Sequence, residues 1–521
     1  MRDHPVMLGR AHAVLVLFAL VTVGCSAIGD RGEDSARGLS GGDPVAAVLR
    51  AAYTTISDRY VDPIDPAALV LSGLNGLSAI DPAVHVVAHG AAIEIEINGT
   101  VAARMAMPEP DDVRGWSDLS ATSIAVVREA SPLVATTPQD RILDVVLAQS
   151  IASLDRFSRY ATANEAVGHR ARRQGYGGVG IRFRQDGGHV VVTDVMDDSP
   201  AARADVRVGD RITHIDGADL NGETAHRVAL RLRGPVGSRL RLTMARDGLS
   251  TVLQFELERM HLITPTVRLR DDDGILYVAV SGFNQDTARS LALALGSGLA
   301  DYSRGVVLDL RGNPGGLLHQ SILVADLFLA GGRIVMTQGR HPDSRQLYLA
   351  DDHDAVAGAP MVVVLDGGSA SAAEIVAAAL KDRGRAVVLG TSSYGKGTVQ
   401  TVAPLPNDGE LVLTWSRLIS PSGRIIGTDG VIPTLCTSGI EKPSRGDPQQ
   451  VLRNATRRPP IPAEASPRDC PAEHHAKDTD LRVARAVLAD PGLYRRFVVP
   501  VAGAAAVAEM TLPVERPVGT P

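Results

Sequence analysis

The chain has 521 residues, a length that favours about three or four domains rather than one. Hydrophobic residues make up 45% and charged residues 21%, which is typical of a folded globular protein and not of a disordered one. Aromatic residues make up only 3%, so the cores must consist mainly of Val, Leu, Ile and Ala. The net charge is −6 at pH 7 and no run of Lys or Arg occurs, which argues against a nucleic-acid-binding protein.

Residues 1–25 have the pattern of an export signal. Two arginines supply positive charge, and residues 13–23 form an apolar run that is short for a membrane span. The run ends in Gly24-Cys25, which is similar to a bacterial lipobox, where the cysteine is lipidated and becomes the mature N-terminus. We therefore predict an exported protein of the cell envelope, held at the outer face of the membrane by lipid on Cys25. An uncleaved N-terminal anchor is the alternative, and it also leaves the body of the protein outside the cytoplasm.

Residues 26–43, rich in Gly, Ser, Asp and Arg, are a predicted linker. For residues 44–170 the sequence predicts a helical N-terminal region with an inserted β-hairpin. The hairpin follows from alternating Ile and Glu at residues 93–97, which run into Asn98-Gly99. The helical patterns cover residues 44–79 and 139–155.

Residues 171–258 carry several short strands and one helical pattern, at 224–232. Residues 259–435 alternate strand and helix patterns, which predicts an α/β layer with crossover connections. After them, residues 436–521 have the composition of a Pro-rich, polar C-terminal tail, with one predicted helix at 478–489. The chain as a whole is therefore predicted to be a multi-domain α/β protein.

The chain contains only three cysteines, Cys25, Cys436 and Cys470. If Cys25 carries lipid, the other two are the remaining candidates for an intrachain disulfide, which an oxidising compartment would allow. Two unpaired thiols are the alternative, because a sequence does not give the distance between them. No spacing typical of metal ligands occurs, and the sequence predicts no metal site and no cofactor.

The segment from Asp366 to Glu374 has the pattern of a buried strand, a turn of small residues and a helix that begins near Ser371. A serine at such a turn points outward, and the N–H groups of the helix N-terminus favour negative charge beside it. We therefore consider Ser371 a candidate nucleophile and the N–H of Ala372 a candidate oxyanion donor. The alternative is structural, because Ser371 and Glu374 have the spacing of a capping box.

The segment from Gly390 to Gln400 contains Lys396 between two glycines. It nearly matches a phosphate-binding loop, but Gly397 stands where the hydroxyl that binds Mg²⁺ is required. Burial lowers the pKa of a lysine, so its neutral amine can accept a proton from a serine. Lys396 is thus a candidate base and Gln400 a candidate orienting group, and a surface lysine in a turn is the alternative.

Residues 309–317 form a third segment of this kind, in which a strand pattern is followed by a Gly-rich turn and a helix. The N–H of Gly315 or of Gly316 is a candidate second oxyanion donor. A tight connection between a strand and a helix is the alternative.

Taken together, the three segments resemble the carboxyl-terminal processing (tail-specific) peptidases. The family's three motifs occur here in the same order, and the serine and lysine are separated as in the family. The resemblance implies Ser371 as nucleophile, Lys396 as base and Gln400 as the third member of the catalytic site, without metal or cofactor. The motifs read LDLRGNPGGL at 308–317, SASAAE at 369–374 and YGKGTVQ at 394–400.

The same resemblance covers residues 46–434 and includes a PDZ domain at 171–258. Such domains bind an extended C-terminal tail as an added strand, so the expected partners are protein or peptide substrates. The peptide-binding residues implied by the glycine-rich start of the domain are Gly177, Gly178, Val179, Gly180 and Ile181. The resemblance implies that residues 259–435 are an α/β serine protease core.

Two departures from the family pattern occur. The family runs quickly from its "YVDP" motif to its "SLDPHSRY" motif, whereas residues 64–152 intervene here. Thr434 stands where the family has an Asp. The function implied is that of an exported serine endopeptidase, and the alternative is an inactive PDZ-containing scaffold lipoprotein of the cell envelope.

Overall fold

The computed structural model describes most of the chain from Asp43 onward. The predicted signal peptide, the lipidation site at Cys25 and nearly all of the predicted linker lie outside the described residues. Among the helices that the structure describes, none combines the length and the apolar character that a membrane span requires. The described residues are 43–297, 304–440, 453–454, 456–462, 465–474, 478–498 and, for the backbone alone, 514–515.

The N-terminal region packs helices against a small sheet around one apolar core. The predicted hairpin is present, and positive φ angles of 53° at Asn98 and 75° at Gly99 form its turn. The sequence analysis missed a third strand, β1, and the longest helix, α3, so the insertion is a folded layer and not a lone hairpin. The elements are α1 (Pro44–Arg59), α2 (Pro66–Asn75), η1 (Gly76–Ala79), β1 (Val84–His89), β2 (Ala92–Ile97), β3 (Thr100–Ala106), α3 (Val113–Ala130), α4 (Pro132–Ala135) and α5 (Gln139–Ala152).

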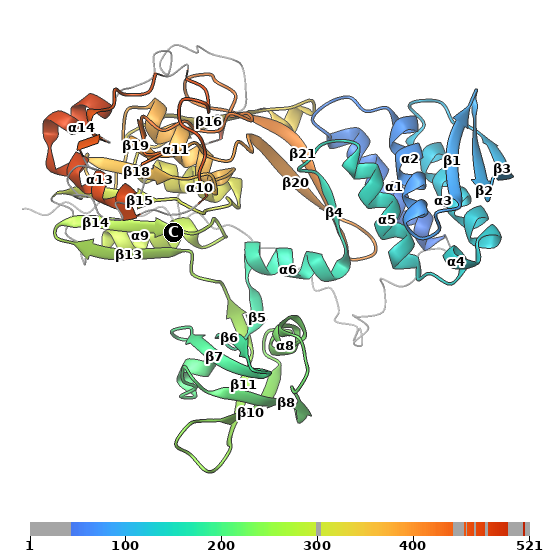
Figure 1. Ribbon diagram of the computed structural model, residues 1–521, viewed down its shortest axis with the longest axis horizontal. Helices are drawn as coiled ribbons and strands as arrows, with labels where there is room; N and C mark the ends of the chain where they lie inside the picture. Colours follow the sequence, from blue (N-terminus) through green and yellow to red (C-terminus); the bar gives the residue numbers. More distant parts are fainter. Residues whose placement is uncertain are drawn as a thin grey trace, which may run out of the picture. The chain divides into compact units, whose positions relative to one another are not determined.

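The next region is a strongly bent sheet with the strand order β11-β10-β8-β7-β6, closed by one amphipathic helix, α8. In it β6 is an edge strand, whose outer side is not paired with any described strand. The two-stranded pair β5 and β12 joins this sheet to the rest of the chain at both of its ends (Figure 1). The elements are β4 (Arg159–Ala161), α6 (Ala163–Gln174), β5 (Tyr176–Gly178), β6 (Ile181–Asp186), β7 (His189–Val195), α7 (Pro200–Arg203), β8 (Arg211–Ile215), β9 (Ala218–Asp219), α8 (Ala225–Leu232), β10 (Arg239–Ala245), β11 (Leu253–Glu258) and β12 (Met260–Leu262).

The central sheet of the following region has the order β13-β14-β15-β18-β19-β22 and is parallel from β14 onward. Its inner strands β15 and β18 are short and almost wholly apolar, as expected for a parallel sheet buried on both faces. This confirms the predicted α/β layer. The elements are β13 (Val267–Asp272), β14 (Ile275–Val280), α9 (Thr287–Gly296), β15 (Gly305–Asp309), α10 (Leu318–Asp326), β18 (Met361–Leu365), α11 (Ala372–Asp382), β19 (Val387–Gly390) and β22 (Leu435–Cys436).

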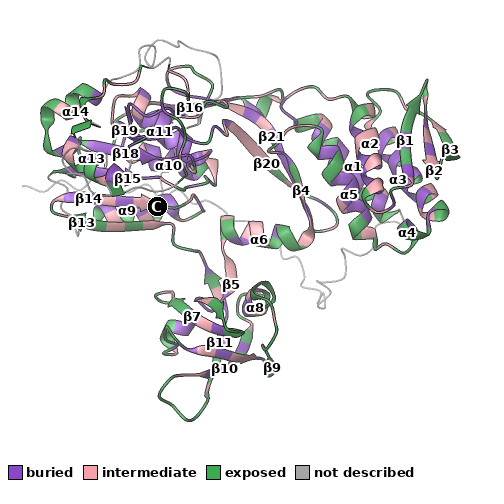
Figure 2. Ribbon diagram, viewed as in Figure 1, coloured by how far each residue is buried: buried purple, intermediate pink, exposed green. Residues whose placement is uncertain are grey.

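Alternate residues of β18 reach the two faces of this sheet. Val363 and its neighbours at 361 and 365 pack with helices α9, α10 and α11 in one core. Val362 and Val364 pack in a second core with α13 (Asp478–Ala489) and α14 (Pro491–Phe497). The result is a three-layer arrangement in which β15, β18 and α11 are almost entirely buried (Figure 2). Residues 478–498 thus complete the core, which differs from the polar tail expected for 436–521.

A second sheet carries the segment after Lys396. It has the order β20-β21-β16-β17-β23, and β4, which precedes α6 in the chain, pairs with β21. The strand and helix patterns of residues 259–435 did not predict this second sheet, because the partners of its strands are distant in the sequence. The elements are β16 (Gly332–Gln338), η2 (Pro342–Ser344), β17 (Gln346–Ala350), β20 (Thr398–Pro404), β21 (Glu410–Ile419) and β23 (Val514–Glu515).

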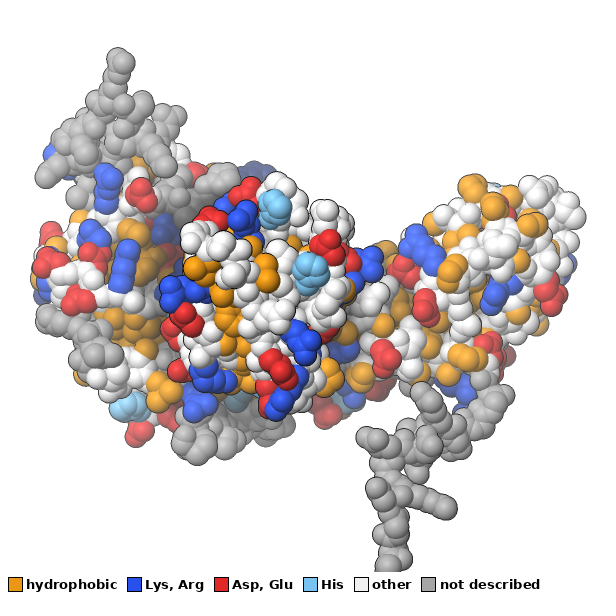
Figure 3. Space-filling view, turned by 90° about the horizontal axis from the view of Figure 1, so that it is seen from below, with side chains coloured by type: hydrophobic (Ala, Val, Ile, Leu, Met, Phe, Trp, Pro, Cys, Tyr) orange, Lys and Arg blue, Asp and Glu red, His pale blue; other side chains and the backbone are white. Residues whose placement is uncertain are grey.

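The surface carries charges of both signs. On the face drawn in Figure 3, Lys and Arg side chains lie among Asp and Glu side chains, so no block of one charge covers that face. An interspersed surface of this kind does not favour a polyanion such as nucleic acid.

Candidate active site

The predicted nucleophile lies on a strained turn. Strand β18 ends at Leu365, helix α11 begins at Ala372, and Ser371 between them has φ 55° and ψ −113°. This is a backbone conformation that a residue with a Cβ rarely adopts, and it costs about 1–3 kcal/mol. Such strain is typical of a side chain held in place for chemistry, and the first N–H of α11, on Ala372, lies next to it in the chain.

The carboxylate of Glu374 connects this turn to the loop that carries Lys396. It is fully buried and accepts four hydrogen bonds, more than a capping box requires. Oε2 accepts from the N–H of Ser371 at 2.6 Å and from the N–H of Lys396 at 3.0 Å. Oε1 accepts from the N–H of Gly395 at 2.7 Å and from the hydroxyl of Ser393 at 2.6 Å. One side chain therefore fixes the backbones of the candidate nucleophile and the candidate base together.

The amine of Lys396 lies in a place that favours its neutral form. Burial, and then the nearby positive charge of Arg159, lower the pKa of Lys396, against smaller opposing effects of Glu374 and Asp155. Its Nζ lies 5.9 Å from the centre of the Phe157 ring and makes no hydrogen bond within the described part of the chain. Lys396 is thus available as a base, but its amine does not hydrogen-bond to Ser371 in this conformation.

Gln400 does not reach Lys396. Its Nε2 donates to Thr398 Oγ1 at 2.8 Å and to Thr414 Oγ1 at 3.3 Å, on strands β20 and β21. The hydroxyl of Thr414 in turn donates to the carboxylate of Asp155 at 3.2 Å, and Asp155 is two residues before Phe157 in the chain. The side-chain amide of Gln400 is therefore linked to the residues around Lys396, but it does not make the direct hydrogen bond to the Lys396 amine that a triad requires.

The two candidate oxyanion glycines differ. The N–H of Gly315 donates to Asn313 Oδ1 at 2.8 Å, whereas the N–H of Gly316 has no acceptor among the described residues. Gly315 instead packs against the nucleophile, since a Cβ placed there would lie 2.8 Å from the Cβ of Ser371. The N–H of Gly316 is therefore the one of the two that is available to an oxyanion. Gly315 instead leaves room for Ser371, because it has no side chain.

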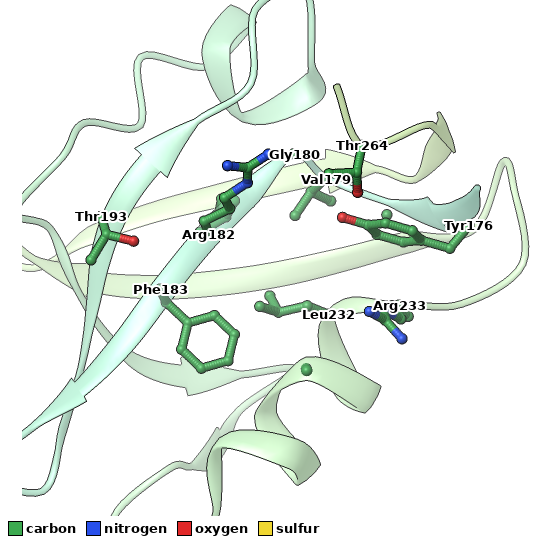
Figure 4. A pocket seen from close by; sticks show the side chains of 12 residues that line it. Tyr176, Val179, Gly180, Arg182, Phe183, Thr193, Leu232, Arg233 and Thr264 are labelled. Carbon is green, nitrogen blue, oxygen red and sulfur yellow. The ribbon is translucent and has the colours of Figure 1, made fainter. Parts of the chain in front are cut away.

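A groove on the second region lies between its edge strand β6 and helix α8. It has a volume of about 440 Å³. Figure 4 shows the ring of Phe183 and the aliphatic side chain of Leu232 among the groups that line it. Of the five peptide-binding residues predicted for this region, Gly178, Val179, Gly180 and Ile181 line the groove. Gly177 does not, because it pairs with His261 in the two-stranded connection.

Sequence reasoning missed several residues around Lys396. Glu374 was considered only as a helix cap, although a glutamate inside an apolar helix is itself a signal that its carboxylate has buried partners. The sequence did not predict that Asp155, Phe157 and Arg159 surround Lys396, because their position there depends on β4 pairing with β21.

Known proteins match both regions. Residues 274–436 match the model of peptidase family S41, and residues 177–257 match that of the PDZ domain. A carboxy-terminal-processing protease of Bartonella bacilliformis is 37% identical over 314 residues, which are 59% of this chain and 72% of that relative. The carboxy-terminal processing protease CtpA of Bacillus subtilis is 28% identical over 300 residues, 57% of this chain and 64% of the relative.

Among solved structures, a photosystem II D1 C-terminal processing protease covers 88% of this chain and is itself covered completely, with 22% identity and a TM-score of 0.39. The family assignment rests on the sequence relatives and on the two family models. The Bartonella relative, 37% identical over 72% of its own length, and the two family models lead to one conclusion: the chain belongs to the carboxy-terminal-processing proteases of peptidase family S41 and is a serine protease with a PDZ domain.

Proposed function

We propose that this chain is an exported serine endopeptidase that binds protein C-terminal tails through its PDZ domain and hydrolyses peptide bonds with Ser371 and Lys396. The observation that carries this proposal is the Glu374 carboxylate, which holds the backbones of both residues at once. A shared buried acceptor of this kind preorganises two groups that the reaction needs side by side.

In the proposed reaction, Ser371 Oγ forms a bond to the substrate carbonyl carbon while its proton passes to the neutral amine of Lys396. The N–H groups of Ala372 and Gly316 stabilise the negative oxygen that results. Lys396 then gives the proton to the leaving amine as the peptide C–N bond breaks. Water attacks the acyl-serine with Lys396 again as base, which releases the acid and restores Ser371.

In the proposed reaction, the side chains of Lys396 and Gln400 leave their described positions to reach this arrangement. The Lys396 amine has no hydrogen bond to give up within the described residues, and Gln400 must exchange its two threonine partners for the amine. Rotation of exposed or half-buried side chains is fast compared with catalysis. Binding of a substrate tail is the event that we expect to favour the aligned state.

The tail is expected to add as a strand to the free edge of β6, with its last side chain over Phe183 and Leu232. The membrane is the second proposed partner, through lipid on Cys25. Export is supported by the signal-like first 25 residues. It is also supported by the disulfide between Cys436 and Cys470, since such bonds persist in oxidising compartments.

The test is cleavage of an unstructured reporter with an apolar C-terminus by the full chain and by its Ser371→Ala variant. We expect the wild type to cut and the variant to be slower by about a thousandfold or more, with tail binding unchanged. If both proteins bind the tail and neither cuts, the chain is instead an inactive PDZ-containing scaffold. Equal cleavage by both would remove Ser371 from the reaction.

A further inference from the structure

A short segment beyond the region that matches the peptidase family lies against both catalytic loops. We call residues 470–474 the strap. A disulfide between Cys470 and Cys436 joins it to the end of β22, with the two Cα atoms 5.7 Å apart. Glu473 adds a second attachment, because its Oε1 accepts from the hydroxyl of Ser438 and from the N–H of Gly439, both at 2.9 Å. The strap is thus fixed to the core at both of its ends.

The strap contacts the loop that leads to Ser371. The N–H of Gly367 donates to the carbonyl of Glu473 at 2.6 Å. Gly367 has no room for a side chain on that side, since a Cβ would lie 2.9 Å from the ring of His474. The start of the nucleophile turn is therefore packed directly against the strap.

The strap also contacts the loop that leads to Lys396. Thr391 Oγ1 accepts from the N–H of Glu473 at 3.1 Å, and Ser392 Oγ donates to the carbonyl of Cys470 at 2.6 Å. Thr391, Ser392 and Cys470 are all buried. Breaking these hydrogen bonds would therefore leave polar groups without water as a replacement partner, which costs free energy. The next residue, Ser393, is the one whose hydroxyl binds Glu374.

These contacts form a continuous path from the disulfide to the catalytic groups. We propose that the strap is a positioning segment for catalysis, which holds both catalytic loops in register as long as the Cys436–Cys470 disulfide is closed. The inference rests on the proposed function of Ser371 and Lys396, and it adds a segment that the peptidase match, which ends at residue 436, does not contain. Thr391 and Ser392 act through the loop and not on the substrate.

The first test measures amide hydrogen exchange of the full chain, oxidised and after reduction of the disulfide. We expect reduction to speed exchange at least about tenfold at 366–371 and 390–397, because the strap loses its anchor. Peptides from the PDZ domain, residues 177–257, are the internal control and should not change. Unchanged exchange in both catalytic loops would overturn the proposal. This measurement needs no cleavage, so it stands even if the proposed protease function fails.

The second test removes one strap contact without touching the disulfide. Thr391→Val keeps the shape and loses the hydroxyl, whereas Thr391→Ser keeps the hydroxyl. We expect Thr391→Val to lower kcat about tenfold with KM for a short peptide unchanged, and Thr391→Ser to restore most of it.

The matched control is Tyr494→Phe, which removes a hydroxyl that accepts from the N–H of Met361, at the opposite end of β18. We expect this variant to lose stability without losing kcat. If Thr391→Val and Tyr494→Phe lower kcat equally, or if the loss follows the melting temperature in both, the strap is structural only and the proposal is wrong.

Discussion

The two catalytic loops are built in different ways. The loop that carries Ser371 is short and joins a strand to a helix, and its backbone is constrained: Ser371 has φ 55°, and Asp366 accepts from the N–H groups of Gly312 and Gly368. The loop that carries Lys396 has no regular structure and is fixed by distant parts of the chain. Its Gly397 is so close to the Ile426 carbonyl that a Cβ would lie 1.3 Å from that oxygen. The proposed nucleophile thus combines a constrained turn between regular elements with distant contacts, whereas the proposed base lies in an irregular loop that depends on tertiary packing.

The largest effect is expected for Lys396→Met, which removes the base. Activity should fall to the level of Ser371→Ala, while the wild-type rate should rise with pH as the amine loses its proton, because burial lowers the pKa of Lys396. A wild-type rate that is flat from pH 5 to 8 would contradict a lysine base.

The same variant has an expected effect on stability. Because the pKa of Lys396 is lower in the folded state, the unfolded state binds more protons, and wild-type stability rises with pH. Lys396→Met should therefore be more stable than the wild type at neutral pH, measured by denaturant unfolding, and the difference should vanish above pH 10.5. Lys381→Met is the control. Lys381 is also partly buried, but it donates to the Ile432 carbonyl at 2.7 Å, so its loss should destabilise the fold.

Glu374→Gln tests the link between the two loops. In this variant the NH₂ group of the amide faces N–H or O–H donors whose hydrogen bonds a carboxylate oxygen accepts. We therefore expect a loss of about 2 kcal/mol in unfolding free energy and about a hundredfold in kcat. Asp382→Asn is the matched control, since Asp382 is a buried carboxylate at the other end of α11 that accepts from Ser420 and Ser422. It should cost similar stability and leave kcat unchanged; equal losses of kcat in both variants would break the proposed link.

Gly397→Ala tests whether packing holds the base loop. The clash with Ile426 should cost about 3 kcal/mol and lower kcat, measured by denaturant unfolding and by peptide cleavage. Gly358→Ala is the control, because Gly358 also has a positive φ, 75°, but nothing within 4 Å of its Cβ position. It should cost only about 1 kcal/mol.

The smallest effect is expected for Ser371→Gly compared with Ser371→Ala. Both variants are inactive, but glycine adopts a φ of 55° freely, so the glycine variant should be more stable by about 1 kcal/mol. Equal unfolding free energies would show that the turn around Ser371 is not strained.

The sequence predicted what depends on short stretches of chain. The helix at 478–489 and the turn at Asn98-Gly99 were predicted correctly, and so was the start of a helix next to Ser371, because caps, periodicity and turn residues act locally. The sequence did not predict that the side chain of Asn313 accepts a hydrogen bond from the N–H of Gly315 and not from that of Gly316. Such a choice depends on the fold of one loop and not on its composition.

The same distinction explains the errors farther from the site. Three of the four hydrogen bonds of Glu374 join residues about twenty positions apart, and the orientation of Gln400 depends on Thr414 of the neighbouring strand. A polar, Pro-rich composition suggested a tail after residue 436. The apolar residues of α13 that contact the sheet are few, however, and their role is visible only beside Val362 and Val364.

The dependence of the central sheet on α13 and α14 has a consequence for biosynthesis. A chain emerging from the ribosome, or threading through an export channel, presents β18 and its neighbours before it presents Val483 or Phe497. Until those last helices arrive, one face of the sheet is uncovered and the strap has not reached Thr391 or Ser392. The order of synthesis thus places the last contacts of the core and of the strap after Ser371 and Lys396 have been added to the chain.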